Sequence, residues 1–498
     1  MANRTINKVL IANRGEIAVR IMRTCKERGI QTVAIYSEPD RSAFHVRMAD
    51  EAFLVGPAPA SESYLRIDNI LAIAKKTKAD AIHPGYGFLS ENADFAQACD
   101  DANIIFIGPP INAIRSMGDK TAARTLMEKA GVPMSPGTTE AIVDRAEARL
   151  IAKRIGYPVL IKAAAGGGGK GMRIVADPAE FDSAIETAQR EAQSAFGDDR
   201  VFVEKYIDNP RHIEFQILAD EHGNIVHLFE RECSIQRRHQ KVVEEAPSAC
   251  VTAELRMKMG QAAVDAAKSV EYVGAGTVEF LVDDGGNFYF MEMNTRLQVE
   301  HPVTEWITGL DLVAEQIRIA CGERLGYSQK DLSINGHAIE CRVYAEDPFS
   351  DFLPAPGMIT TYKEPGGPGV RVDSAMDGPA EVPIYYDPMI SKLVTWGPTR
   401  SDAINRMSRA LDEYTIAGVR TTIPFCHFVM RDDAFIAGNI STHFIQDRFD
   451  PEKMSQTNAD DNKWAAVVGA FVHSSNGKNH ARGTSADSPA WRNRTQED

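Results

Sequence analysis

The chain has 498 residues, of which 44% are apolar, so it is long enough for several hydrophobic cores and predicts about three domains. Its 69 acidic residues outnumber its 55 basic residues, and the net charge of −14 disfavours a nucleic-acid partner. The seven cysteines are scattered and never spaced CxxC, which is typical of reduced thiols in a cytoplasm. Neither a signal peptide nor a membrane-spanning run of about 18 apolar residues is predicted.

Apolar strand signals alternate with amphipathic helix signals in the first part of the chain. Strands are predicted at KVLIA, QTVAIYSE, ADAIHPGYG and IIFIG, and helices at NRGEIAVRIMRTCKERG and FAQACDDAN. Strands that alternate with helices form parallel sheets covered by helices, so a doubly wound α/β domain is predicted over residues 1–116.

The remaining chain divides into three further segments. Residues 117–330 are predicted to form a second α/β domain, with strands at PVLIKAA, RVFVEKYI, HIEFQILAD, GTVEFLVDD and NFYFMEMN. A mixed α+β domain is predicted over residues 331–449, where many prolines and glycines separate short strands. Residues 450–498 form a predicted polar tail with one short docking helix at 464–472, and a fully disordered tail is the alternative.

Four consecutive glycines follow the strand PVLIKAA, in the sequence AAAGGGGKGMRIV. A Walker A loop is excluded, because Ala164 occupies its first glycine position and Gly171 its hydroxyl position. The dinucleotide pattern GxGxxG is present, but no helix is predicted after it. Strand signals on both sides instead predict a hairpin lid whose bare amides close over phosphates, with a mobile surface loop as the alternative.

A second hairpin is predicted with its turn centred on Gly285 and Gly286. This register places Glu279 directly opposite Glu292, with Asn294 on the same face. Two facing carboxylates repel by about 3 kcal/mol at about 5 Å and an effective dielectric of about 20, so a cation should compensate them. Two carboxylates and an amide oxygen suit Mg²⁺, and the alternative is that both glutamates point to solvent.

Polar residues continue at every second position after this hairpin. Asn294, Arg296, Gln298 and Glu300 would lie on one side of an extended segment, which a helix predicted after Thr304 would end. Such a row could bind a small planar oxyanion through Arg296, with Glu300 as a base. A surface strand with paired charges is the alternative.

Seven motifs together resemble the biotin carboxylases, the ATP-grasp components of biotin-dependent carboxylases. They are IANRGEIA, HPGYGFLSEN, MGDK, GGGGKGM, ERECSIQRRHQKVVEEAP, EMNTRLQVEHPVTE and YYDPMISKL. The resemblance covers about residues 7–449, in order and without large gaps. It implies an α/β fold of three domains: a doubly wound N-terminal domain, an ATP-grasp domain with a glycine-rich lid, and a mixed α+β C-terminal domain.

By this resemblance, ATP lies under the lid and a divalent metal lies beside it. The residues implied to bind the nucleotide are Lys120, Lys162, Gly167, Gly168, Gly169, Glu204, Lys205, Ile207, His212, Gln236 and His239. The implied ligands of Mg²⁺ or Mn²⁺ are Glu279, Glu292 and Asn294, in agreement with the register of the hairpin.

The resemblance also implies the chemistry. Bicarbonate attacks the γ-phosphate of ATP to form carboxyphosphate, whose breakdown delivers CO₂ to the ureido nitrogen of biotin. Glu300 is the implied base, and Lys241, Arg296, Gln298 and the Val299 backbone amide are implied to bind bicarbonate.

Three further residues receive roles in the same way. Arg342 is implied to hold the phosphate leaving group, while Tyr86 and Gly87 flank the ureido ring of biotin. The implied partners are a biotin carboxyl carrier protein, a second copy of the chain in a homodimer, and a carboxyltransferase subunit. The final acceptor stays open among acetyl-CoA, propionyl-CoA, pyruvate and 2-oxoglutarate.

Two other functions compete with this one. Another ATP-grasp carboxylate ligase would share the lid, the lysines and the metal-binding face, but not the sequence TRLQVEHP. A non-catalytic nucleotide-binding regulatory subunit would be expected to lack Arg296, Glu300 or a metal ligand, and none of them is missing.

The sequence MKM at 257–259 resembles the core of a biotin attachment site. An attachment lysine must project from a tight hairpin, whereas here Thr252 can cap a helix whose apolar residues recur at helical spacing. Lys258 is therefore predicted to lie on a solvated helix face. Biotin is expected on a separate carrier protein, with this chain as one subunit of a larger carboxylase.

Overall fold

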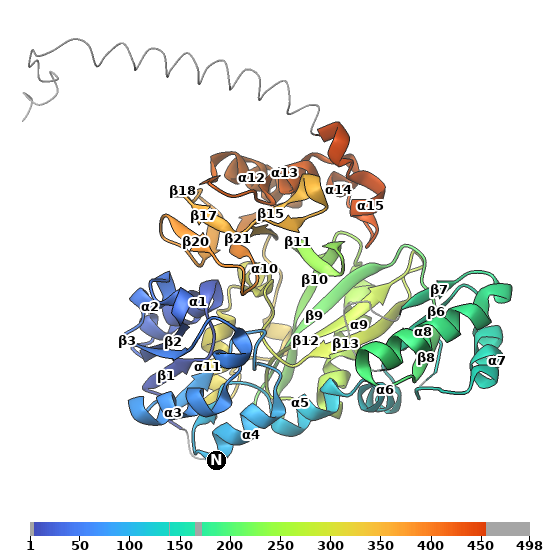
Figure 1. Ribbon diagram of the computed structural model, residues 1–498, viewed down its shortest axis with the longest axis horizontal. Helices are drawn as coiled ribbons and strands as arrows, with labels where there is room; N and C mark the ends of the chain where they lie inside the picture. Colours follow the sequence, from blue (N-terminus) through green and yellow to red (C-terminus); the bar gives the residue numbers. More distant parts are fainter. Residues whose placement is uncertain (1–3, 139, 165–171, 455–498) are drawn as a thin grey trace, which may run out of the picture. The chain divides into compact units, whose positions relative to one another are not determined.

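The computed structural model describes residues 4–138, 140–164 and 172–454 (Figure 1). The chain divides into two compact units, Met1–Phe449 and Asp450–Asp498. The central part of the predicted glycine lid and the predicted tail helix at 464–472 both lie outside the described residues. No helix of the described residues is long and apolar enough to cross a membrane.

The N-terminal region contains a parallel sheet of five strands in the order β3-β2-β1-β4-β5. These strands are β1 (Lys8–Ile11), β2 (Gln31–Ser37), β3 (Glu51–Gly56), β4 (Ala81–His83) and β5 (Ile105–Phe106). The helices are α1 (Gly15–Glu27), α2 (Phe44–Met48), α3 (Ile67–Thr77), α4 (Ala93–Asp101) and α5 (Ile111–Gly118). The alternation of strands and helices predicted from the sequence is confirmed.

Both faces of this sheet are buried. Val9 and Ile11 pack into the core that α1 shares, whereas Leu10 between them packs into the core of α3 and α4. Alternate residues of one strand therefore face opposite layers, which explains why the strand is apolar throughout. Helix α1 ends before Gly29, whose φ of 69° suits the left-handed position that terminates helices.

The predicted lid hairpin belongs to a small antiparallel sheet of order β7-β6-β8. Its strands are β6 (Val159–Ala163), β7 (Arg173–Val175) and β8 (Val201–Lys205), and the neighbouring helices are α6 (Lys120–Lys129), α7 (Arg145–Ile155) and α8 (Phe181–Phe196). Ile161 on β6 pairs with Arg173 on β7, so the two strands predicted on either side of the glycine-rich segment are confirmed. Apolar residues of α7 and α8 form a core with this sheet.

An eight-stranded sheet of order β13-β12-β9-β10-β11-β14-β21-β19 carries the expected metal ligands and several other expected site residues. Its strands are β9 (Arg211–Ala219), β10 (Ile225–Arg237), β11 (Gln240–Ala246), β12 (Gly274–Val282), β13 (Phe288–Asn294), β14 (His337–Tyr344), β19 (Val370–Ser374) and β21 (Met389–Gly397). Pairing of β11 with β14 makes it continuous across the expected boundary at residue 330. The second and third predicted segments thus share one sheet.

Helices and short hairpins complete the unit. The helices are α9 (Ala253–Ser269), α10 (His301–Thr308), α11 (Leu312–Ala320), α12 (Arg400–Glu413), α13 (Ile423–Arg431), α14 (Asp433–Ile436) and α15 (Phe444–Arg448). The short strand pairs are β15 (Glu346–Asp347) with β16 (Leu353–Pro354), β17 (Gly357–Ile359) with β20 (Ala380–Val382), and β18 (Thr361–Lys363) with β22 (Thr415–Ala417).

Helix α10 begins at His301, earlier in the chain than the helix predicted after Thr304. Pro302 lies in its first turn, where the missing N–H of proline costs no hydrogen bond. The extended row predicted from Asn294 therefore stops earlier than expected, and Glu300 occupies the N-cap position of the helix.

The register of the β12–β13 hairpin is confirmed at the site residues, with Glu279 opposite Glu292 and Thr277 opposite Asn294. Closer to the turn, however, the register shifts by one residue. A β-bulge, with Met291 as the extra residue, accounts for the shift, and the turn is centred on Gly285 alone. The centre of the turn was predicted wrongly, at Gly285 and Gly286 together. The pairing of Glu279 with Glu292 is nevertheless confirmed, because the bulge between the turn and this pair shifts the register by one residue.

Candidate active site

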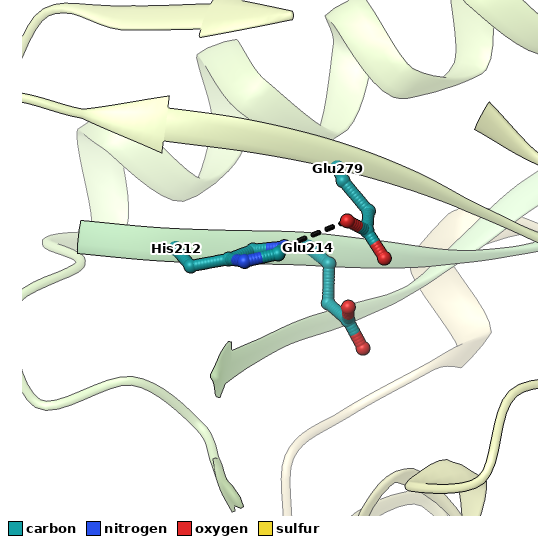
Figure 2. A group of neighbouring side chains, drawn as sticks. All are labelled: His212, Glu214 and Glu279. Atoms are coloured by element: carbon teal, nitrogen blue, oxygen red, sulfur yellow. Dashed lines mark ion pairs between the residues drawn. The ribbon is translucent and has the colours of Figure 1, made fainter. Parts of the chain in front are cut away.

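Glu279 lies at the centre of a buried polar cluster on the eight-stranded sheet. Its Oε1 accepts hydrogen bonds from Lys241 Nζ at 2.9 Å, Asn294 Nδ2 at 2.9 Å and Gln298 Nε2 at 2.6 Å. Its Oε2 lies 2.8 Å from His212 Nε2 (Figure 2). Burial alone would raise the pKa of Glu279, but Lys241 and His212 together hold it well below its usual range.

The expected metal-binding face is formed by the same hairpin. Glu292 pairs with the buried Glu279 and is itself exposed. Although its side chain reaches solvent, the protein packed around its carboxylate and the facing Glu279 carboxylate raise the pKa of Glu292. Asn294 Oδ1 accepts a hydrogen bond from Arg296 Nη2 at 2.8 Å. Two carboxylates and an amide oxygen are a donor set that Mg²⁺ prefers, so the residues fit a divalent metal.

A second combination of ligands overlaps this face. The ligand atoms of His212, Glu214 and Glu279 all lie within 4.8 Å of one another (Figure 2). Glu214 was not expected at the site. With one nitrogen and two oxygen donors this group suits a transition metal better than Mg²⁺, which takes oxygen ligands.

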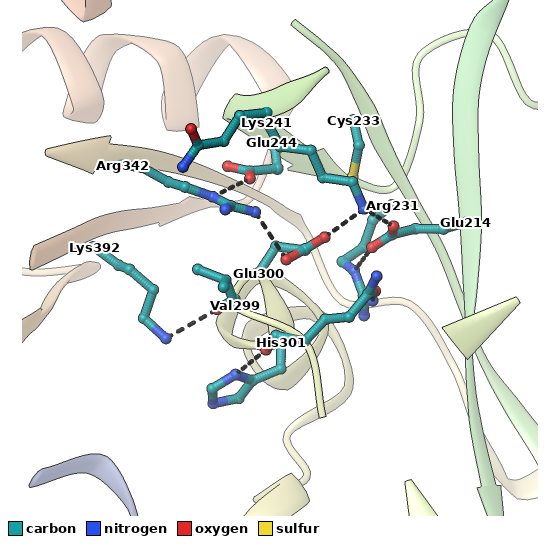
Figure 3. Close-up of polar contacts among 12 residues, drawn as sticks. Glu214, Arg231, Cys233, Lys241, Glu244, Val299, Glu300, His301, Arg342 and Lys392 are labelled. Carbon is teal, nitrogen blue, oxygen red and sulfur yellow. Dashed lines mark hydrogen bonds and ion pairs between the residues drawn. The ribbon is translucent and has the colours of Figure 1, made fainter. Parts of the chain in front are cut away.

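Lys241 connects the metal-binding face to Glu300. Its Nζ lies 2.7 Å from Glu300 Oε1 and also contacts Glu214 (Figure 3). Burial would lower the pKa of Lys241, but the carboxylates of Glu214, Glu279 and Glu300 raise it well above its usual value. The ammonium therefore stays charged, held among three carboxylates.

Glu300 is buried between two cations. Besides Lys241, it is bound by Arg342, whose Nη2 donates to Glu300 Oε2 at 2.9 Å (Figure 3). Burial would raise the pKa of Glu300, yet Lys241 and Arg342 hold it well below its usual range. In this arrangement Glu300 is a charged but weak base, because its conjugate acid is strong.

Arg342 also contacts a further buried carboxylate. Its Nε donates to Glu244 Oε1 at 2.6 Å, and Glu244 on β11 lies opposite Glu340 on β14. Burial, partly offset by Arg342, raises the pKa of Glu244 to about 7. Arg342 is thus bound by the carboxylates of both Glu244 and Glu300. Another anion can bind the guanidinium only by sharing it with these two carboxylates.

The expected nucleotide-binding residues are only partly brought together. Lys162 on β6 pairs with Glu204 on β8 at 2.7 Å, and Gln236 Nε2 lies 2.6 Å from His212 Nδ1. Lys205 instead uses its ammonium to bind the backbone carbonyls of Gly156 and Tyr157 at 3.1 and 3.0 Å. His239 is exposed in the turn between β10 and β11, and Ile207 follows β8. The side chain of Lys120 and residues 167–169 lie outside the described parts.

Two buried residues of the cluster, Arg231 and Glu214, were not predicted from the sequence. Arg231, which is fully buried on β10, donates to Gln298 Oε1 at 2.7 Å and also contacts Glu214 on β9. The sequence does contain a signal for Glu214. His212, Glu214 and Gln216 alternate with apolar residues along one strand, which places three polar side chains on one face.

Glu91 was also missed, and no local pattern identifies it. Its carboxylate accepts hydrogen bonds from Arg296 Nε at 2.8 Å and from the Thr295 N–H at 2.9 Å. More than 200 residues separate the partners, so only the tertiary fold brings them into contact.

Comparison with models of protein families finds matches along nearly the whole described unit. Residues 5–114 match the biotin carboxylase N-terminal domain, and residues 340–447 match the biotin carboxylase C-terminal domain. Residues 119–328 match the ATP binding domain of the carbamoyl-phosphate synthase L chain.

Individual relatives agree with these models. A biotin carboxylase from Nostoc is 58% identical and covers 89% of this chain and 99% of its own length. Biotin carboxylase 1 from Bacillus subtilis is 54% identical and covers 89% of this chain and 98% of its own length. The biotin carboxylase domain of Hydrogenobacter thermophilus 2-oxoglutarate carboxylase, solved with MgADP and bicarbonate, has a TM-score of 0.85 at 52% identity. It covers 89% of this chain and 98% of that one.

The glycine-rich hairpin, its small sheet and the matching ATP binding model define a ligase of the ATP-grasp class. The chain belongs to the biotin carboxylase family, whose members carboxylate biotin with the hydrolysis of ATP. The fold, the enzyme class and the cofactors expected from the motifs are thereby confirmed.

Proposed function

We propose that this chain carboxylates biotin on a separate carrier protein, through carboxyphosphate, as the first half-reaction of a biotin-dependent carboxylase. The observation that carries the proposal is the position of Lys241, whose ammonium lies 2.9 Å from Glu279 and 2.7 Å from Glu300. One cation joins the metal-binding face to the expected base. Activation of bicarbonate beside a bound nucleotide requires this proximity.

The base strength of Glu300 depends on its two cations. When bicarbonate binds Lys241 and phosphate oxygens bind Arg342, both cations are shared with the substrates and the pKa of Glu300 rises. A Glu300 carboxylate oxygen then takes the proton of bicarbonate. The resulting carbonate dianion attacks the γ-phosphorus, the bond to the β,γ-bridging oxygen breaks, and carboxyphosphate and ADP are formed. Substrate binding thus converts a weak base into a stronger one at the time when it is needed.

The other expected residues take their places around this reaction. Glu279, Glu292 and Asn294 would hold Mg²⁺ or Mn²⁺, which neutralises phosphate charge during transfer. Arg296 and Gln298 reach the metal-binding face, at 2.8 Å from Asn294 and 2.6 Å from Glu279. For the nucleotide we assign Lys120, Lys162, Gly167, Gly168, Gly169, Glu204, Lys205, Ile207, His212, Gln236 and His239. The contacts from Lys162 to Glu204 and from Gln236 to His212 support this assignment.

Substrate dependence of ATP hydrolysis tests the proposed function. ATP hydrolysis by the purified chain should require both bicarbonate and free biotin. Stimulation by an acyl or amine acceptor in place of biotin would indicate another ATP-grasp ligase, and binding of ATP without turnover would indicate a regulatory subunit.

Arg296→Ala should damage biotin carboxylation far more than nucleotide binding. The guanidinium lies beside Asn294 and Glu91, where it can bind bicarbonate and stabilise charge that develops on biotin. We expect turnover to fall by about 100-fold, with nucleotide affinity within about threefold of wild type. Titration calorimetry with ADP and steady-state kinetics measure the two quantities separately. An equal loss in both would show that Arg296 has a structural role.

The domain organisation and the partners extend the proposal. We assign residues 1–116, 117–330 and 331–449 to three domains and 450–498 to a tail, and the three family matches support the first three. The partners are a biotin carboxyl carrier protein, a second copy in a homodimer, and a carboxyltransferase subunit. The related Hydrogenobacter domain, described as a dimer, supports the homodimer. Seven free cysteines support the cytoplasmic location.

Lys258 should carry no biotin. It is exposed on α9 and donates to Glu254 one turn earlier at 2.7 Å, while Thr252 caps the helix through the Leu255 N–H as predicted. A ligase cannot reach a lysine in a helix as it reaches one in a hairpin. The intact mass of the chain from its native cell should show no biotin adduct, and Lys258→Ala should keep wild-type turnover. Biotin on Lys258 would contradict the separate carrier.

A further inference from the structure

The turn that leads into α10 has both of its carbonyl groups bound by buried side chains. The Gln298 carbonyl accepts a hydrogen bond from His301 Nδ1 at 2.8 Å, and the Val299 carbonyl accepts one from Lys392 Nζ at 2.9 Å (Figure 3). Burial and the nearby Lys392 ammonium hold the pKa of His301 well below its usual range. The ring is therefore neutral, and its Nδ1 donates to the carbonyl.

Lys392 reaches this turn from the interior of the eight-stranded sheet. It lies on β21, opposite Arg342 on β14 and Asp373 on β19, and its side chain is completely buried. Its Nζ lies 3.3 Å from Glu16 Oε2 and 3.8 Å from Asp373 Oδ2. The hydrogen bond to Val299 is shorter than either of these ionic contacts.

The Val299 carbonyl determines how the next residue is placed. Because a peptide group is planar, fixing this C=O also fixes the N–Cα bond of Glu300, from which the Glu300 side chain departs. The Val299 N–H belongs to the preceding peptide, whose carbonyl is the one that His301 binds. The two side chains together thus fix the backbone on both sides of Val299.

We propose that Lys392 is a positioning residue for bicarbonate activation, holding the Val299 carbonyl so that the Glu300 carboxylate and the Val299 amide face the bicarbonate site. The inference rests on the role proposed above for Glu300. Lys392 itself contacts no reacting atom. Its effect is transmitted through one peptide plane to Glu300. A displacement of a reacting group by about 1 Å can lower the rate by about 100-fold.

The competing explanation is that Lys392 only neutralises the buried carboxylates beside it. Neither carboxylate depends on it completely. Burial raises the pKa of Glu16 to about 7, so Glu16 can become neutral by binding a proton. Asp373 retains Arg371, whose Nη2 lies 2.7 Å away. The Val299 carbonyl cannot compensate in either way. It cannot become neutral by binding a proton, and the hydrogen bond that holds it comes from the Lys392 ammonium.

Lys392→Met keeps most of the length of the side chain and removes its charge and its hydrogen-bond donor. We expect turnover to fall by about 100-fold and the KM for bicarbonate to rise at least about tenfold, while the KM for ATP stays within about twofold. Because this variant leaves Glu16 without its ion pair, it is measured together with the double variant Glu16→Gln/Lys392→Met. In the double variant the melting temperature should return most of the way to the wild-type value, while the KM for bicarbonate should stay as high as in Lys392→Met.

Ser391→Ala is the matched control. Ser391 precedes Lys392 on β21, faces away from the turn and hydrogen-bonds Tyr414 at 2.6 Å. It should lower the melting temperature without changing the KM for bicarbonate. Recovery of turnover in the double variant would overturn the proposal and leave Lys392 with a role in charge neutralisation only.

Glu300→Gln, assayed in parallel, distinguishes a failure of the proposed role of Glu300 from a failure of the proposed role of Lys392. If it keeps turnover, the proposed role of Glu300 fails and the role of Lys392 fails with it. If it loses turnover while Glu16→Gln/Lys392→Met keeps it, only the positioning role of Lys392 is wrong.

Discussion

Replacing Glu300 by glutamine is expected to lower biotin-dependent ATP turnover by about 100- to 10,000-fold, the range that a positioned base contributes. The amide keeps the shape of the side chain but cannot take the proton of bicarbonate. Lys241 retains Glu214 and Glu279, and Arg342 retains Glu244, so the buried cations keep partners and the chain should still fold. Steady-state turnover at saturating ATP and bicarbonate measures the effect.

Glu340→Gln is the control for this experiment. Glu340 is fully buried on β14, and burial raises its pKa well above the usual value, which favours the neutral form of the side chain. An amide reproduces its shape and its charge, and turnover should stay near wild type. If Glu300→Gln also kept turnover within about tenfold of wild type, Glu300 could not be the base.

Glu292→Gln is expected to lower turnover with saturating Mg²⁺ by at least about 100-fold, because it removes one anionic ligand of the proposed metal site. The metal-free protein should be as stable as wild type or slightly more so, since Glu292 directly faces Glu279 across the hairpin and the two carboxylates repel. The variant is thus expected to lose activity without losing stability, whereas a damaged fold would lose both.

Two measurements test this expectation. Thermal melting with a chelator gives the stability of the metal-free protein, and turnover against Mg²⁺ concentration gives the metal requirement. Asp284→Asn removes a charge from the turn of the same hairpin, where it is exposed, and should change neither quantity. Near-normal turnover of Glu292→Gln would refute the metal assignment.

Local patterns predicted much of the fold because they act over a few residues. The apolar run KVLIA predicted a strand of a helix-covered sheet, and the helical spacing after Thr252 predicted α9. The hairpin register placed Glu279 opposite Glu292, and the structure confirms that pair. Each of these predictions depends on backbone periodicity within a single element or a single hairpin.

What sequence patterns did not predict depends on contacts between distant elements. The surroundings of Lys241 combine Glu214 from β9, Glu279 from β12 and Glu300 at the start of α10, and no spacing along the chain encodes that meeting. The continuity of the sheet from β11 to β14 was missed for the same reason. The bulge at Met291 was not predicted, because no turn-forming residue in the sequence indicates it.

The transfer of oxygen from bicarbonate to phosphate tests the central claim most directly. If the cluster around Lys241 and Glu300 activates bicarbonate to attack ATP, hydrolysis in oxygen-18-labelled bicarbonate and unlabelled water should release phosphate that carries one labelled oxygen for each biotin carboxylated. The label should enter phosphate at the same rate as biotin is carboxylated. Phosphate that contains only unlabelled oxygen would show that water attacks ATP, and would contradict the account.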